Sequence, residues 1–134
     1  MTFMSWTAEE FGTSINKTDD EHQKIFSMVN DLHAIVGGDR SAVGQKLDSL
    51  IGFVANHFQT EEELMKSHGY PGYDAHKEEH DALVATCVDL QNKFKAGQTE
   101  VTEETTTLLK DWLYRHIPKI DKSYGPFLND KGVN

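Results

Sequence analysis

The sequence predicts an all-α protein, an up-down-up-down antiparallel four-helix bundle preceded by an N-terminal arm. Two features of the 134-residue chain point to this class. Apolar residues recur three and four positions apart in four long segments, which is the spacing of one helical face. The connections between these segments are so short that neighbouring helices must run antiparallel. The period-2 alternation bounded by turns that is typical of strands is missing from the sequence.

Start and stop signals give the boundaries of the first two helices. Residues 1–17 form the arm, and Thr18 with Glu21 has the spacing of a capping box, which opens a helix over residues 19–37. The second helix is predicted over residues 41–67, where Gly69 follows as the expected terminator.

The second half of the chain repeats this organisation. A helix over residues 72–96 is followed by a fourth over residues 102–121, which Pro118 interrupts because proline lacks a backbone N–H. Residues 122–134 are predicted to be a C-terminal tail. We expect residues 1–134 to form a single domain, since a chain of this length buries a core without disulfides.

Bulk properties exclude several classes of partner. The formal net charge of −9 disfavours nucleic acid and anionic membrane surfaces. The single cysteine, Cys87, fits a reducing compartment. No signal peptide is evident, and no stretch approaches the ~18 apolar residues of a membrane span. We therefore expect a cytoplasmic protein without stable membrane association. Alternating surface charge and the lack of an additional apolar stripe predict a monomer.

Residues that can bind a metal lie on the apolar face of every predicted helix. They are His22, His57, Glu61, His76, His80, His116 and Asp121. A single histidine in such a position is usually a hydrogen-bonded core residue. Here five histidines are expected to converge at one end of the bundle. An antiparallel bundle brings the starts of the first and third helices to the ends of the second and fourth. Burying these groups without partners would cost about 1–3 kcal/mol each, and a bound metal removes that cost.

Asp121 is the candidate that ideal helical geometry supports least. It follows His116 by five residues, about 140° around an ideal helix, so the two would not normally share a face. Pro118 disturbs this turn and can bring Asp121 inward, although a solvated helix end is the alternative. Five imidazoles and two carboxylates are too many for one ion and suit two.

This arrangement of histidines and carboxylates resembles that of the hemerythrin family, specifically the single-domain bacteriohemerythrins. The resemblance covers nearly the whole chain, including an arm with Trp6. It implies two non-haem iron ions, bridged by an oxo or hydroxo group and by the carboxylates of Glu61 and Asp121. One iron would be bound by three histidines and the other by two, and O2 would bind at the second. The first set is His76, His80 and His116, and the second is His22 and His57.

The resemblance also implies a function and a pocket. The function is reversible oxygen binding rather than catalysis, serving oxygen storage, transport or delivery to an O2-consuming oxidase as client. Five residues match family positions near the O2 pocket, and each is equally an ordinary core residue by its helical position. They are Ile25, Phe58, Trp112, Leu113 and Ile117.

Three alternatives remain open at the level of sequence. The segment HKEEH, residues 76–80, matches the H-x-x-E-H pattern of some zinc proteases, but this reading leaves the other candidate ligands unexplained. A di-iron oxidase or peroxidase is chemically closer, although ferritin-like di-iron proteins use Glu-x-x-His motifs that this chain lacks. An O2 or redox sensor is the third. Outside the pattern, His33 and His68 are predicted to be structural, Cys87 to be core, and Glu62 to be solvated.

Overall fold

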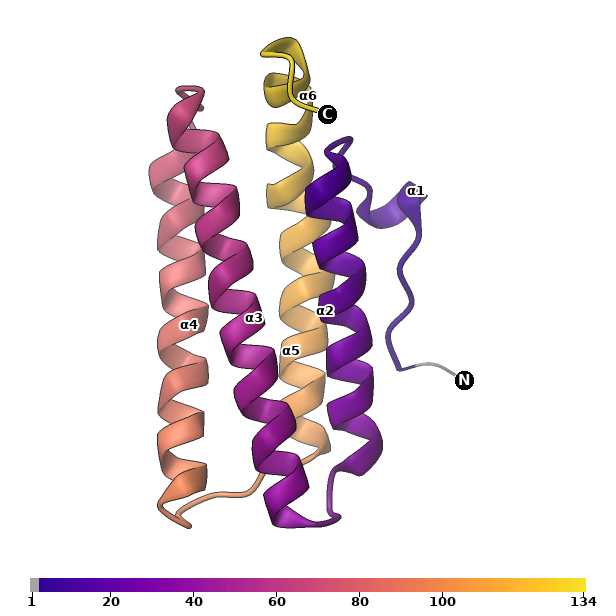
Figure 1. The fold of residues 1–134 in the computed structure, drawn as a ribbon, viewed down its shortest axis with the longest axis vertical. Coiled ribbons are helices and arrows are strands. Elements are labelled where there is room, and N and C mark those ends of the chain that lie inside the picture. Colours follow the sequence, from indigo (N-terminus) through magenta and orange to yellow (C-terminus); the bar gives the residue numbers. More distant parts are fainter. Residues whose placement is uncertain (1–2) are drawn as a thin grey trace.

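Four long helices lie side by side in the computed structural model, which describes residues 3–134 (Figure 1). They are α2 (Asn16–Ile35), α3 (Arg40–Ser67), α4 (Tyr73–Lys95) and α5 (Glu103–His116). Successive helices run in opposite directions, which confirms the predicted up-down-up-down bundle. Three short elements complete the chain: α1 (Ala8–Phe11), the π-helical turn η1 (Ile117–Asp121) and α6 (Lys122–Asp130). Within the described range, no helix combines the length and apolar character needed to cross a bilayer.

The first long helix begins before the predicted capping box. Thr18 lies inside α2 and is buried, and Ile15 precedes the helix without a side-chain cap. The turn into α2 is fastened instead by Asp19, whose Oδ1 accepts hydrogen bonds from the backbone N–H and the hydroxyl of Thr13 at 2.8 and 2.7 Å. The capping-box prediction is therefore wrong. Thr18 lies on the buried side of α2, where its hydroxyl oxygen contacts the hydroxyl of Tyr124 instead of capping the helix.

Helices α3 and α4 match their predicted ranges to within one residue. Asp39 caps α3, its Oδ2 accepting from the backbone N–H of Ala42 at 3.0 Å. Gly69 follows the end of α3 with φ of +70°, a conformation that glycine adopts without steric cost. This turn sends the chain back into α4, antiparallel to α3.

The last helix does not end at Asp121, so the predicted tail over residues 122–134 is wrong for most of its length. The backbone N–H of Lys122 donates to the carbonyl of Ile117, five residues earlier, and the chain continues as α6. Pro118 is accommodated inside this wider turn instead of stopping the helix. Tyr124 and Leu128 are fully buried. They stand three and seven residues after Asp121, so the buried helical stripe simply continues.

The N-terminal arm is ordered along α2 in its described part. The backbone N–H of Met4 donates to Asn30 Oδ1 at 2.7 Å, and Asn30 Nδ2 donates back to the carbonyl of Met4 at 2.9 Å. Phe3 stacks on His33 with ring centroids 3.7 Å apart. Residues 1 and 2 of the predicted arm lie outside the described residues.

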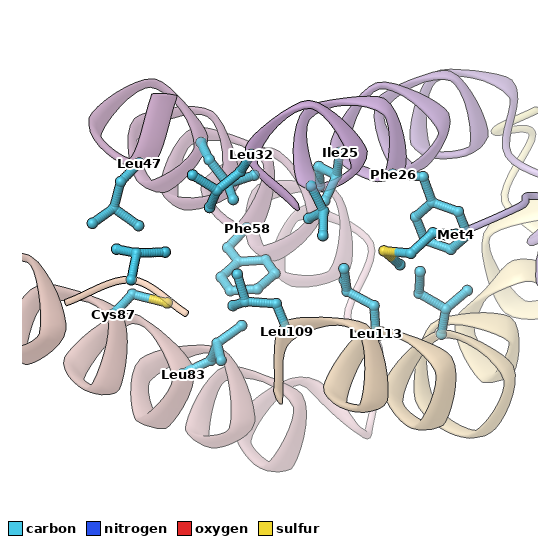
Figure 2. Packing of buried hydrophobic residues seen from close by; sticks show 14 of the residues in the cluster. Met4, Ile25, Phe26, Leu32, Leu47, Phe58, Leu83, Cys87, Leu109 and Leu113 are labelled. Carbon is cyan, nitrogen blue, oxygen red and sulfur yellow. The ribbon is translucent and has the colours of Figure 1, made fainter. Parts of the chain in front are cut away.

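Two apolar clusters lie on either side of a layer near one end of the bundle, which we call the ligand layer. The larger fills the space between the four helices, where Ile25 of α2 faces Leu109 and Leu113 of α5 (Figure 2). The smaller contains Ile15, Met65, Tyr124 and Leu128. Between them, at the upper end in Figure 1, the starts of α2 and α4 meet the ends of α3 and α5. All the predicted metal ligands fall in this layer.

Candidate metal centre

The structure brings the seven predicted ligands together in two adjoining groups. Each group has one potential ligand atom per residue, all within 4.8 Å of one another. All seven side chains are buried, with at most 2% exposure. The three-histidine group is His76, His80, His116 and Asp121, and the two-histidine group is His22, His57 and Glu61.

Asp121 faces both groups with different oxygens. Its Oδ1 lies 2.7 Å from His76 Nε2 and 2.8 Å from His116 Nε2. Its Oδ2 lies 3.1 Å from His22 Nε2 in the other group. The π-turn makes this possible, because a turn closed by an i→i+5 bond returns residue 121 to the face that carries His116. The sequence predicted a disturbed turn at Pro118. The structure shows that this turn is a π-helical turn, which contains one residue more than a turn of α-helix.

Glu61 also lies between the two groups. Its Oε1 is 2.9 Å from His57 Nε2 and 3.6 Å from His80 Nε2. Its other oxygen, Oε2, accepts a hydrogen bond from the hydroxyl of Tyr124. That hydroxyl is also 3.1 Å from Thr18 Oγ1. Tyr124 therefore holds Glu61 from the side opposite the histidines.

Carboxylates outside the two groups hold two of the imidazole rings. Glu21 Oε1 lies 2.7 Å from His57 Nδ1, and Glu62 Oε2 lies 3.0 Å from His80 Nδ1. A carboxylate accepts from Nδ1–H, and the lone pair of the ring is then on Nε2, which points inward. We call Glu21 and Glu62 the outer carboxylates. The prediction that Glu62 is solvated is wrong, since its side chain is only 15% exposed.

The inward-pointing atoms fit a metal better than they fit one another. Six of them are buried and make no hydrogen bond in the described structure: Nε2 of His57, His76, His80 and His116, Oε1 of Glu61 and Oδ1 of Asp121. Several lie about 3 Å apart without hydrogen-bond geometry. Two ligands at right angles, each roughly 2.1 Å from one ion, are separated by about this distance. Imidazole and carboxylate together suit a divalent ion such as iron.

Burial and neighbouring charges shift the pKa values of the metal-free site in opposite directions. Burial lowers the pKa of His57, but the Glu61 carboxylate and the hydrogen bond to Glu21 outweigh it and raise the value to about 10. For His80 burial prevails and lowers the pKa to about 3. Burial disfavours the charged form of Glu61, yet His57 brings the pKa of this carboxyl down to about 2. Without metal, His57 and Glu61 therefore form a buried ion pair beside a neutral His80.

Aromatic rings cover the three-histidine group. Phe58 stacks on His80 with centroids 3.8 Å apart and 1° between the planes. Trp112 stacks on His116 with centroids 4.2 Å apart. The other three predicted pocket residues, Ile25, Leu113 and Ile117, are buried with at most 5% exposure. Four of the five are therefore core residues, whereas Trp112 is half-buried where it stacks on His116.

The remaining histidines lie outside the two groups. His33 Nδ1 is 2.8 Å from the hydroxyl of Thr106, and His68 Nδ1 is 2.8 Å from the carbonyl of Leu64. Glu79, the general base of the zinc-protease alternative, has its Oε1 3.6 Å from His116 Nδ1, on the outer side of that ring. The HKEEH segment thus supplies two histidines to a larger set.

Sequence reasoning missed Glu21, Glu62 and Tyr124. The burial of Tyr124 could have been predicted, because it follows Asp121 by three residues and so lies on the same helical face. Glu21 was taken for a capping residue. The contact between Glu62 and His80 joins two helices across 18 residues, and no local pattern in the sequence marks it.

Comparisons with known proteins agree with this geometry. The family model described as "Hemerythrin HHE cation binding domain" matches residues 13–128. A bacteriohemerythrin from Methylococcus capsulatus (strain Bath) is 52% identical over 130 residues, covering 96% of this chain and 99% of the relative. A myohemerythrin from Theromyzon tessulatum is 34% identical, covering 87% of each chain.

Solved structures show the same fold. A crystal structure described as wild-type hemerythrin superposes with a TM-score of 0.93 at 53% identity, covering 94% of this chain and 98% of its own. A second, of a hemerythrin mutant, superposes with a TM-score of 0.94 at 52% identity, covering 96% of this chain and 98% of its own. The chain therefore belongs to the hemerythrin family, and within it resembles the bacteriohemerythrins over nearly its whole length.

Proposed function

We propose that this hemerythrin binds dioxygen reversibly at two iron ions held by the seven buried ligands, and that it acts as an oxygen-binding protein rather than an enzyme. The observation that carries the proposal is the pair of adjoining groups whose inward-pointing nitrogen and oxygen atoms lack hydrogen-bond partners. When bound, the two iron ions supply the electrons that reversible dioxygen binding requires.

Each residue has a distinct part in this proposal. His76, His80 and His116 would hold one iron, and His22 and His57 would hold the other. Asp121 bridges the two, which is supported by the approach of its two oxygens to different groups. Glu61, which lies between the two groups, would be the second bridge beside an oxo or hydroxo group. With only two histidines beside the shared carboxylates, the second group would leave more of its iron open to dioxygen.

The surrounding residues keep the site dry and rigid. Phe58 and Trp112 cover imidazole rings, and Ile25, Leu113 and Ile117 close the space beside them. Water and protons are thereby excluded, which slows irreversible oxidation of the iron. Outer carboxylates fix ring orientation before metal arrives, so little reorganisation is required on binding.

We propose storage or delivery of oxygen in the cytoplasm as the physiological role, with an O2-consuming oxidase as the client. A buried, unpaired Cys87 is consistent with a reducing compartment. A monomeric state is supported by the surface, where the strongly exposed large apolar side chains of the described residues are Val88 and Leu108, on different helices.

Iron titration tests the ligand assignment. Metal-free protein is titrated anaerobically with ferrous iron, and we expect binding to saturate at two ions per chain. His22→Asn should lower this stoichiometry, whereas His33→Asn, on the same helix but outside both groups, should leave it unchanged. Equal loss in both variants would contradict the assignment, because it would show that general destabilisation rather than ligand removal releases the iron.

A further inference from the structure

An apolar cavity lies inside the bundle, beyond the ligand layer. Its volume is about 30 Å³, and aliphatic side chains of α2, α3, α4 and α5 line it together with the thiol of Cys87. Part of this lining is visible in Figure 2, where Ile25, Leu83, Leu109 and Leu113 surround the interior between the helices. No charged side chain contributes to the wall.

The cavity begins one helical turn from the predicted ligands on every helix. Each of the four helices contributes one lining residue that stands three positions from a predicted ligand, which is a single turn. These pairs are Ile25 with His22, Val54 with His57, Leu83 with His80, and Leu113 with His116. From there the cavity extends to Leu47 and Leu90, toward the opposite end of the bundle.

The size and chemistry of the wall select the occupant. A cavity needs roughly 10–15 Å³ to admit one water molecule, so this one has room for a single small molecule. Water would give up its hydrogen bonds on entering, and apolar cavities of this kind stay dry. Dioxygen has no hydrogen bonds to lose and gains dispersion contacts with the aliphatic wall.

We propose that this cavity is a docking site for dioxygen, occupied by the gas one helical turn before it reaches the iron ions. Its role in oxygen uptake rests on the proposed function, whereas its ability to hold a small apolar gas does not.

Cys87 is chemically compatible with such an occupant. Burial raises the pKa of its thiol to about 11, so the residue stays in the thiol form at neutral pH. The thiolate is the reactive form of cysteine, and a buried thiol in apolar surroundings is inert. Cys87 can therefore contact dioxygen as a small apolar group.

Xenon is the probe that tests the cavity. Crystals of the protein are pressurised with xenon, and its anomalous signal is sought between the helices. The cavity is filled in Cys87→Leu and in Val29→Ile, since both residues line it. Val88→Leu is the matched control, because Val88 adjoins Cys87 on α4 but is 38% exposed. Oxygen association is then followed by stopped flow in the iron-loaded forms of all four proteins.

We expect xenon in the parent and the Val88 variant, its loss in both filled variants, and several-fold slower oxygen association in those two. Absence of xenon from the parent cavity would overturn the proposal. So would unchanged association rates in filled variants that have lost xenon, because dioxygen would then reach the iron by another path. Xenon bound in a protein that shows no reversible oxygen spectrum would instead count against the proposed function alone.

Discussion

Glu62 and Glu63 are neighbours on α3, yet only Glu62 reaches a predicted ligand. Oε2 of Glu62 accepts a hydrogen bond from Nδ1–H of His80, whereas Glu63 is exposed. The amide of Glu62→Gln retains an acceptor but loses the charge that orients and polarises the ring. Changes to such partners of metal-binding histidines typically cost about 10–100-fold in metal affinity.

We therefore expect Glu62→Gln to weaken iron binding by at least about 10-fold, measured by competition with a chelator. Glu63→Gln is the control and should match the parent protein. If the two variants released iron alike, the contact between Glu62 and His80 would have no part in holding the metal.

Leu113 separates the ligand layer from the apolar interior. It is 5% exposed and stands one turn before His116. Leu113→Ala leaves room for a water molecule beside the polar ligand atoms, and we expect faster autoxidation, followed as decay of the oxygenated visible band. The variant should also lose about 2–5 kcal/mol of unfolding free energy, as buried leucines truncated to alanine usually do.

The matched control for this change lies on the same helix. Leu108 is 53% exposed, so Leu108→Ala should alter neither the autoxidation rate nor the unfolding free energy appreciably. An autoxidation rate in Leu113→Ala equal to that of the parent would show that this side chain does not exclude water from the site.

At the scale of elements, α6 depends on a close approach to the turn before α2. Gly125 is buried in α6, and a Cβ added there would overlap the backbone carbonyl of Thr13. Gly125→Ala must therefore push α6 away from Thr13 and disturb Tyr124, which holds Glu61. We expect a lower unfolding free energy, by roughly 1–3 kcal/mol, together with weaker iron retention.

A second glycine gives the opposite expectation. Gly52 lies in the middle of α3 on its solvent-exposed side, and a Cβ added there would meet no neighbouring atom. Gly52→Ala should raise the unfolding free energy by about 0.5–1 kcal/mol in denaturant unfolding. A stabilised Gly125→Ala would mean that α6 does not pack as closely on Thr13 as described.

The sequence was informative about elements with regular spacing and poor about irregular ones. The bundle and the ranges of α3 and α4 followed from apolar periodicity and from glycines such as Gly69. The end of α5 did not, because Pro118 stops an α-helix but fits a π-turn, and local rules do not distinguish the two. The seven candidate ligands were found from their shared buried face, whereas the outer carboxylates required the packing of neighbouring helices.

For the whole molecule, pH acts differently on the metal-free and iron-loaded forms. The pKa of His57 rises from 6.5 to about 10, so its contribution to stability is complete below pH 6.5 and is lost as pH rises through about 10. The pKa of His80 is lowered from 6.5 to about 3, so the folded state loses stability as pH falls below 6.5. Glu61 adds a further loss below pH 4.5, as pH falls toward its pKa of about 2.

We therefore expect the unfolding free energy of metal-free protein to peak near pH 6.5 and to decline on both sides, measured by denaturant unfolding across this range. Iron binding requires deprotonated imidazoles, so the loaded protein should retain iron at alkaline pH and lose it below about pH 6. Full retention of iron at about pH 4 would contradict histidine ligation of both ions.

The most direct test of reversible oxygen binding combines metal analysis with one visible spectrum taken three times. Reduced protein is examined under argon, then in air, then under argon again. Two irons per chain, with a charge-transfer band that appears in air and fades on deoxygenation, is the result we predict. Two irons with one-way oxidation, or a single zinc, would contradict the account.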